Sequence, residues 1–483
     1  MRSASLLSVS PDRSWYFGDS SVRVRLPIFV LPILALVAGA LIPSALQAQL
    51  TSQQKQANLD SFDLVWKTVR DRHPDPALNG LDWTAIRAAT RPRIESAASM
   101  DEVRDLLRGM LAKLQASHYA IIPVELYRQI DSQPVNLASA LSPSSGPPSS
   151  AAPSSAKAKE AERERRVENG SPGIVPVVIG GKAVVGQVEP GSPAERAGIR
   201  PGMVLEGING ATLTPMMRFL DDLNNQESQQ IVEQTMARRL DGPVDQPIAV
   251  DLVDERGAAK HVELGRTPPK GTLVHFGNLP ETRLYFESKR LPEGTGYIRF
   301  NEFLDPASIM PQFQNALREF KDAPGIILDL RGNPGGIGIM AMGIAGFFID
   351  KDGKKLGDMK MRDTTLKFVI FPRPETYAGP LAILVDEGSA STTEILAGGL
   401  QDLGRARIFG VRTAGAALPS DIIRLPNGDG FQYAQAIYTS VKGKVLEGAG
   451  VTPDTVVRQT REALLAGHDL VIEAAEQWIV SHR

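Results

Sequence analysis

The chain has 483 residues, of which 42% are hydrophobic, and this length can bury the cores of about three domains. The formal net charge of -2 carries no information about partners, and the lack of a basic stripe with interleaved aromatic residues argues against a nucleic-acid partner. The chain contains no cysteine, which excludes disulfides, thiol nucleophiles and thiolate metal sites. Clustered metal ligands are also absent from the sequence, so we expect neither a metal nor another cofactor.

The N-terminal segment has the pattern of a targeting signal. Two arginines precede an apolar run from residue 26 to 42, which ends in small residues. Residues 1–48 are therefore predicted to be a signal peptide cleaved near Ala48, which places the mature protein in the periplasm or outside the cell. Pro27 and Pro32 argue against a permanent membrane helix. An uncleaved anchor remains the alternative, and this segment is the only predicted route to a membrane.

Residues 50–130 are predicted to form an N-terminal helical domain. Apolar residues recur there at helical spacing on two stripes. The stripes comprise Phe62, Val65, Trp66 and Val69, then Val103, Leu106, Leu107, Met110, Leu111 and Leu114. Residues 131–172 turn into Ser, Pro, Ala and a charged run that cannot bury a core, so they are predicted to be a flexible linker.

From residue 173 to 266 the pattern changes to short strands with one short helix. Ser192 can cap that helix, Pro193 suits its first position, and Gly198 can end it. The pair Asn209-Gly210 predicts a tight hairpin turn. The segment is therefore expected to be a small β-rich domain.

This succession resembles a PDZ domain of the type found in bacterial proteases. The resemblance implies that an extended peptide is added as a strand, with its end held by loop amides at Gly173, Ile174 and Val175. Pro176 lies in the strand that would receive the peptide, and it lacks an amide donor. The sequence therefore leaves open whether this domain captures peptides or serves only as a packing module.

Residues 271–483 alternate strands and helices, which predicts an α/β core with its chemistry at the carboxyl ends of the strands. The predicted strands and helices, in order, are 297–300, 307–320, 326–330, 337–348, 381–385, 395–403 and 407–411. Ser391 falls on the turn between a strand and a helix, where a nucleophile can meet helix amides. Ser391 and Glu394 also form a capping box, which needs no catalytic explanation.

A second strand end carries a glycine-rich loop, Asp329-Leu-Arg-Gly-Asn-Pro-Gly-Gly336. Glycines let backbone amides approach a ligand, so an oxyanion hole is a natural use, with a plain turn as the alternative. A phosphate-binding loop is not expected, because the Gly-Lys-Ser/Thr ending is missing.

Together with Ser389-Ala-Ser-Thr-Thr-Glu-Ile395 and Gly410–Gly415, this loop resembles the C-terminal processing (tail-specific) protease family of serine peptidases and its tricorn-like branch. The resemblance covers most of the mature chain. It implies a crotonase-like, ClpP-related α/β core, preceded by a helical domain and an inserted PDZ domain. Protein or peptide substrates and water would be the only reactants.

The chain departs from the processing-protease motif at one position. With Ser391 aligned as the nucleophile, the expected catalytic lysine falls on Ala416, which cannot take a proton. Lys442 and Lys444 are nearby in sequence, but neither occupies the motif position. A Ser-Lys dyad is therefore not expected.

The resemblance to the tricorn-like branch supplies another base. Ser117-His118 and Glu447 match that branch's motifs, which implies His118 as general base, oriented by Glu447 through Ser117. These residues also have structural interpretations that need no catalytic role: Ser117-His118 can end a helix, and Glu447 can be a solvated turn carboxylate.

The resemblance further implies that amides of Thr392 and of Gly335 or Gly336 hold the oxyanion. With an ordinary histidine, turnover would be lost as the pH drops through roughly 6 to 7. The sequence therefore predicts a secreted or periplasmic serine peptidase. The alternative is a catalytically inactive peptide-binding protein of the same fold.

Overall fold

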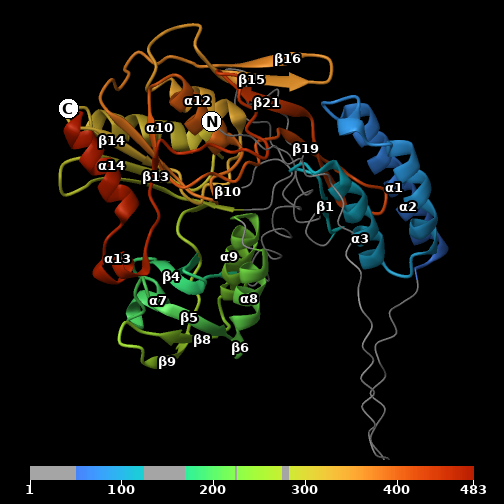
Figure 1. Cartoon of the computed structure of the whole chain (residues 1–483), viewed down its shortest axis with the longest axis horizontal. Helices are drawn as coiled ribbons and strands as arrows, with labels where there is room; N and C mark the ends of the chain where they lie inside the picture. The colour runs from blue at the N-terminus through green and yellow to red at the C-terminus, as the bar shows by residue number, and fades with distance from the viewer. Residues whose placement is uncertain (1–49, 125–168, 224–225, 275–281, 483) are drawn as a thin grey trace, which may run out of the picture. The chain divides into compact units, whose positions relative to one another are not determined.

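The computed structural model describes residues 50–124, 169–223, 226–274 and 282–482 (Figure 1). The predicted signal peptide, and the predicted linker except for residues 169–172, lie outside these residues. Residues 49–483 group into one unit by their contacts. No helix among the described residues is long and apolar enough to cross a membrane.

The region predicted to be helical contains α1 (Ser52–Arg72), α2 (Trp83–Ser96) and α3 (Met100–Leu111), with single 3-10 turns η1 (Leu78–Gly80) and η2 (Ala112–Leu114). Thr51, Asp82 and Ser99 accept hydrogen bonds from amides in the first turns of the three helices. These caps satisfy donors that a helix leaves unpaired. Both predicted apolar stripes contribute to one core, which also includes Leu425, Phe431 and Tyr433 from the C-terminal region.

An antiparallel sheet follows, in the order β3 (Ile174–Ile179), β4 (Lys182–Val188), β5 (Val204–Ile208), β8 (Ile248–Val253) and β9 (Ala259–Leu264), with β6 (Ala211–Thr212) beside β5. The remaining elements are α7 (Pro193–Arg196), α8 (Thr214–Leu223), α9 (Gln226–Leu240) and the pair β2 (Asn169–Gly170) with β7 (Gly242–Pro243). The expected cap is present, because Ser192 Oγ accepts from the Glu195 amide at 3.2 Å. Asn209 and Gly210 both have positive φ, as the predicted hairpin turn requires.

The C-terminal region is built on a six-stranded sheet. Its order is β12 (Phe286–Arg290), β13 (Gly296–Phe300), β14 (Ile326–Asp329), β17 (Leu381–Val385), β18 (Arg407–Gly410) and β22 (Thr455–Val456). All pairs are parallel except β12 with β13. The strands predicted from the sequence are therefore confirmed, and they are adjacent.

Helices cover both faces of this sheet (Figure 1). Alternate residues of β13, β14, β17 and β18 pack on α10 (Pro306–Glu319), α11 (Gly338–Ala345) and α12 (Thr392–Asp402), or on α14 (Leu470–Ser481). Burial on both faces explains why these strands are continuously apolar in sequence. Helix α12 begins three residues earlier than predicted, because Ser391 ends the turn and Thr392 is already helical.

Smaller elements join the regions. One three-stranded sheet contains β16 (Thr365–Val369), β15 (Lys355–Met361) and β21 (Ala436–Ser440), and β10 (Thr272–Val274) pairs with β11 (Thr282–Leu284). Another contains β1 (Ala120–Ile122), β20 (Gly430–Ala434) and β19 (Ser420–Arg424), so a strand directly after His118 pairs with the C-terminal region. Arg461 of α13 (Arg461–Ala466) donates to the carbonyl of Gly202 at 2.8 Å, which ties the β-rich region to the same unit.

Candidate active site

Ser391 occupies the turn between β17 and α12, and its backbone is strained. Its φ of 56° and ψ of -118° are uncommon for a residue with a side chain. Such strain clusters at functional sites, including the strand-to-helix turn that presents a nucleophilic serine. An ordinary N-cap has extended backbone instead. The capping-box interpretation therefore accounts for Glu394, which accepts from the Ser391 amide at 3.0 Å, but not for the Ser391 backbone.

Glu394 fastens the Ser391 turn to the segment after β18. Its buried carboxylate accepts hydrogen bonds from the Thr413 hydroxyl and from the amides of Gly415 and Ala416, at 2.8 and 2.9 Å. Burial raises the pKa of Glu394, and these hydrogen bonds oppose the rise. The Ser391 amide also donates to the Ala416 carbonyl at 3.0 Å. The position where the processing-protease motif has lysine therefore lies against the Ser391 turn, and here it carries a methyl group.

The glycine-rich loop between β14 and α11 packs on the same turn. Gly335 has φ of 100°, and a Cβ atom there would lie 2.8 Å from both Ser391 Cβ and Thr392 N. Gly336 has φ of 134°, and a Cβ atom there would lie 2.4 Å from the Phe303 carbonyl oxygen. Both positions therefore require glycine for conformation and for space.

Asn333 holds this loop in place. It is fully buried, and its Oδ1 accepts from the Gly335 amide at 2.9 Å and from the Thr393 hydroxyl at 3.0 Å. Its carbonyl accepts from the Ala390 amide at 3.1 Å. The Gly335 amide is thus engaged, whereas the amides of Gly336 and of the first residue of α12 have no hydrogen-bond partner among the described residues. The geometry favours Gly336 over Gly335 as an oxyanion donor, a choice that the sequence left open.

Ser389, two residues before the candidate nucleophile, has a structural role. Its side chain is fully buried and donates to the Leu330 carbonyl at 2.8 Å. Asp386 is its second partner, at 3.2 Å, and also accepts from the amides of Gly332 and Gly388. Burial raises the pKa of Asp386, although these hydrogen bonds oppose the rise. Asp386, like Asn333, was not singled out in the sequence, although it directly follows a buried strand.

A charge network supports the glycine-rich loop from behind. Arg331 makes paired hydrogen bonds to Asp329, at 2.9 and 2.6 Å, and to Asp469 at the start of α14, at 3.1 and 2.9 Å. Tyr297 also donates to Asp329 at 2.8 Å. Burial alone would raise the pKa of Asp329, but the charge and hydrogen bonds of Arg331 lower it to about 2. The loop therefore starts from a rigid ionic anchor.

Ser117, His118 and Glu447 form a second group. Glu447 accepts from the Ser117 amide at 2.6 Å and from the Ser117 hydroxyl at 3.0 Å. Ser117 Oγ lies 2.6 Å from His118 Nδ1. Glu447, which lies 330 positions after Ser117 in the chain, is therefore brought together with Ser117 and His118 as the sequence motifs implied.

The hydrogen bonds assign the histidine tautomer. Since the Ser117 hydroxyl has a single proton and directs it to Glu447, it accepts from His118 Nδ1, which leaves Nε2 with a free lone pair. Burial lowers the pKa of His118 to about 4. The imidazole is therefore neutral near pH 7, the state that a general base needs.

The Ser391 turn and the Ser117-His118-Glu447 group are both hydrogen-bonded to the segment Ala416-Ala417. The amide of Ala416 donates to Glu394, beneath the Ser391 turn, and the next amide, of Ala417, donates to Glu447 at 3.0 Å. Among the described residues no hydrogen bond joins Ser391 Oγ to the His118 imidazole. Catalytic hydrogen bonds are often long in ligand-free enzymes and tighten with substrate. Lys442 and Lys444 are both exposed.

The predicted peptide-binding residues of the β-rich region lie at the start of edge strand β3. The Gly173 amide is bonded to Ser171 Oγ at 3.1 Å, and a Cβ atom on Gly173 would collide with Ser192. Ile174 is buried, whereas Val175 is 41% exposed. Of the three predicted residues, Val175 is the one whose side chain faces solvent.

Further along β3, side chains of α9 occupy the open strand edge. Glu233 accepts from the Val178 amide at 2.7 Å, and Gln229 donates to the Val178 carbonyl at 3.3 Å. The ladder to β4 also shifts register at Pro176, which has no amide to offer. Burial raises the pKa of Glu233 to about 7. A peptide that adds to this edge must therefore displace Glu233 and Gln229.

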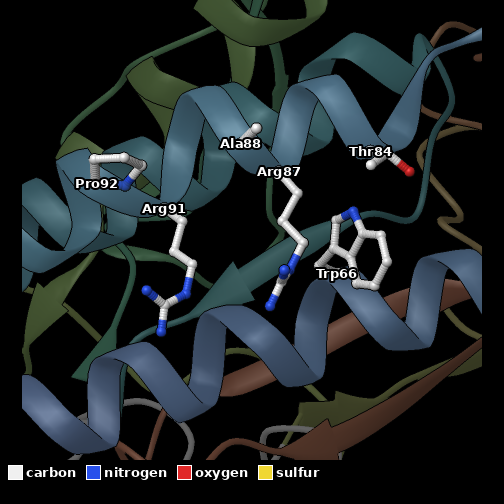
Figure 2. A pocket seen from close by; sticks show the side chains of 6 residues that line it. All are labelled: Trp66, Thr84, Arg87, Ala88, Arg91 and Pro92. Carbon is white, nitrogen blue, oxygen red and sulfur yellow. The ribbon is translucent and has the colours of Figure 1, made fainter.

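A pocket between α1 and α2 is separate from the candidate site (Figure 2). The Arg87 guanidinium lies 5.0 Å from the Trp66 ring centre and pairs with Asp63 at 2.6 Å. None of the candidate catalytic residues lines this pocket. The part of the chain that the structure describes holds no group of three or more His, Asp or Glu residues that could bind a metal.

Comparison with known protein families finds three matches. They are Peptidase family S41 at residues 294–457, the Tricorn protease C1 domain at residues 55–112, and a PDZ domain at residues 184–223. The S41 match contains Ser391, the glycine-rich loop and Glu447.

Similar proteins of known name support these matches. Carboxyl-terminal-processing peptidase 3, chloroplastic, of Arabidopsis thaliana is 27% identical over 452 residues, which are 90% of this chain and 75% of the relative. The carboxyl-terminal-processing protease of Synechocystis sp. is 29% identical over 275 residues, 56% of this chain and 57% of the relative. The solved structure of the photosystem II D1 C-terminal processing protease aligns with a TM-score of 0.51 and 21% identity, over 89% of this chain and 97% of that one, a likeness of fold. Residues 294–457 of the chain therefore match Peptidase family S41, behind matches to the Tricorn protease C1 domain and to a PDZ domain, and its named relatives are carboxyl-terminal-processing proteases.

Proposed function

We propose that the protein hydrolyses peptide bonds through an acyl-enzyme on Ser391, with His118 as the general base. His118 Nε2 takes the hydroxyl proton while Ser391 Oγ attacks the carbonyl carbon. The amides of Gly336 and Thr392 then stabilise the oxyanion. The imidazolium returns its proton to the leaving amine, and water repeats the sequence to release the acid. Glu447 stabilises the imidazolium through Ser117.

One observation carries this proposal. Two consecutive amides, of Ala416 and Ala417, hold the carboxylates of Glu394 and Glu447. The first carboxylate belongs to the nucleophile turn, and the second belongs to the histidine group. Because successive Cα atoms are only about 3.8 Å apart, the two groups must lie beside each other.

The absence of a lysine supports the histidine assignment. Ala416 lies against the nucleophile turn, so the motif position is correctly placed but has no proton acceptor. The neutral His118 has the protonation state that the lysine of a Ser-Lys dyad reaches only when its pKa is strongly depressed. A Ser-His-Ser-Glu arrangement of the tricorn-like type therefore fits the residues present.

The substrates would be proteins or peptides, cleaved in the manner of a carboxyl-terminal-processing protease, as the names of the relatives suggest. The PDZ region would present the substrate chain from the start of β3. The helical, PDZ and peptidase regions would follow the boundaries predicted from the sequence, and the core would be of the crotonase-like type. A periplasmic or secreted location rests on the N-terminal sequence pattern. Water is the only co-substrate.

A serine-directed fluorophosphonate probe tests the proposal on the full chain. Wild-type protein should be labelled on Ser391, as located by peptide mass spectrometry, and should hydrolyse a denatured protein substrate. Ser391→Ala and His118→Ala should lose both properties while remaining folded by circular dichroism. Hydrolysis that survives His118→Ala would remove the assigned base. Peptide binding without hydrolysis or labelling in any condition would favour the inactive peptide-binding alternative, which the match to Peptidase family S41 does not favour.

A further inference from the structure

The turn between β19 and β20, residues 426–429, receives the helical region. The Asn427 amide donates to Ser61 Oγ at 2.9 Å, and its side chain donates to Asn58 Oδ1 at 3.0 Å, both on α1. Ser61 and Asn58 are buried. Buried polar groups need partners, so this contact specifies how α1 docks on the turn. We call residues 426–429 the docking turn.

Asp429 is the last residue of the docking turn and is fully buried. Arg104 of α3 reaches it with two hydrogen bonds, Nε to Oδ2 at 3.1 Å and a terminal nitrogen to Oδ1 at 2.8 Å. The same Oδ1 accepts from the Val124 amide at 2.7 Å. Bidentate arginine pairs fix orientation as well as distance. One carboxylate therefore binds two separate points of the helical region.

These two points lie on either side of His118 in the chain. Arg104 belongs to the helix that leads into Ser117-His118, and Val124 follows β1, the strand directly after it. Strand β1 pairs with β20, with Ile121 opposite Phe431. The segment that carries His118 is thus held at both ends by β20 and the turn before it. These contacts fix the docking of the helical region on the C-terminal region.

Stability alone does not explain a buried ion pair in this place. Removing two charges from water is costly, and well-packed apolar residues often replace such pairs without loss of stability. What apolar residues cannot reproduce is a simultaneous directed bond to Arg104 and to a backbone amide. The contribution that remains for the Arg104–Asp429 pair is to fix the relative orientation of the segments that it joins.

We infer that Asp429 is a positioning residue for the reaction, because its buried carboxylate clamps the chain before and after His118 and so holds the imidazole at the peptidase core. The inference rests on the proposed role of His118 as general base. Asp429 does not contact the reacting atoms, and its effect passes through the His118 segment. Loss of the clamp should therefore lower kcat, while KM for a short peptide changes little.

The test compares three variants of the full chain. Asp429→Asn keeps an acceptor but removes the charge. Arg104→Met combined with Asp429→Leu replaces the pair by apolar side chains, and we expect it to stay folded even if the single variant unfolds. Arg362→Ala is the matched control, because Arg362 also joins the helical region to the C-terminal region, through the carbonyls at the end of α1, but does not hold the His118 segment.

Both clamp variants are expected to lose roughly hundredfold in kcat at pH 7 with KM nearly unchanged, because small displacements of a catalytic group have such effects. The acid limb of kcat/KM should also move upward from about 4 towards the ordinary value of 6.5 as the imidazole becomes hydrated, and Arg362→Ala should leave it unchanged. A lower melting temperature with unchanged kcat and pH profile would reduce Asp429 to a structural residue. His118→Ala, measured in parallel, separates the two hypotheses: if it is active the proposed base fails, and if it is inactive while both clamp variants match wild type, the positioning inference alone fails.

Discussion

The two halves of the candidate site are built in different ways. The Ser391 half consists of loops at the carboxyl ends of three adjacent parallel strands, β14, β17 and β18, which meet at one edge of the sheet. The His118 half comes from another region and reaches that edge through Glu447, β1 and the docking turn. The first half is preformed by the sheet, whereas the second depends on docking. Substitutions in the first half should therefore lower activity by removing a reacting group, whereas substitutions in the second half should lower it by displacing His118.

The nucleophile half gives the largest expected effect. Ser391→Ala should lower kcat at least ~10⁴-fold, because the remaining groups act only through the nucleophile. Ser389→Ala should still be labelled by the fluorophosphonate probe, but its unfolding free energy should fall by about 1–3 kcal/mol, because buried partners lose a hydrogen bond. Chemical denaturation and probe labelling measure the two effects. Abolished labelling in a folded Ser389→Ala protein would shift the assigned nucleophile by two residues.

The histidine half gives the next effect. His118→Ala should lower kcat on the order of a thousandfold. Because burial lowers the pKa of His118 to about 4, the wild-type rate should persist through pH 6 to 7 and fall only as the pH approaches 4, which corrects the expectation from the sequence. A pH profile of kcat/KM decides this. A rate that rises only above pH 9 would indicate a lysine base.

The same shift affects stability. Between pH 6.5 and about 4 the folded protein binds fewer protons at His118 than the unfolded chain does. The free energy of unfolding should therefore fall as the pH falls through this window. Denaturation of the His118→Ala variant should lack that part of the pH dependence, and equal slopes in both proteins would contradict the buried neutral imidazole.

Two glycines of one loop sharpen the comparison within the nucleophile half. Gly335→Ala places a methyl group 2.8 Å from Ser391 Cβ, so kcat should fall roughly hundredfold through a displaced oxyanion site. Gly332→Ala is the matched control, because φ there is also positive but no atom lies within 4 Å of the new Cβ. That control should lose about 1–2 kcal/mol of stability and keep its kcat within a few-fold. Equal losses of kcat would mean that backbone strain, and not contact with Ser391, matters.

The smallest effect is expected away from the chemistry. Glu233→Ala should free the Val178 amide and raise the affinity for an extended peptide by roughly three- to tenfold, the equivalent of one hydrogen bond. Fluorescence anisotropy of a labelled peptide on the Ser391→Ala background measures this affinity. Gln234→Ala, an exposed neighbour on the same helix, is the control. Unchanged affinity would place peptide binding elsewhere than on β3.

Much of the nucleophile half could be predicted from the sequence. Each parallel strand is a short continuous apolar run, and the polar or glycine residues that follow it must lie at one sheet edge. The amino acids at Ser391, Gly335 and Gly336 also suit conformations that a local pattern reveals, namely a strand-to-helix turn and positive φ. The missing lysine at Ala416 was visible from the resemblance to the processing-protease motif. The ends of the strands, the turn at Ser391 and the positive φ values depend mainly on residues close in sequence, so a local pattern reveals them.

Only the tertiary structure decided which groups are free and which are engaged. The Gly335 amide is taken by Asn333, Ser389 is buried among the strand ends, and Asp429 clamps the His118 segment, and none of this follows from spacing in sequence. The lowered pKa of His118 likewise arises from burial, which depends on everything packed around the ring. A sequence pattern shows which side chains lie at the end of each strand or helix. Solvation and hydrogen-bond partners depend on contacts between residues hundreds of positions apart, so they are defined only once the chain has folded.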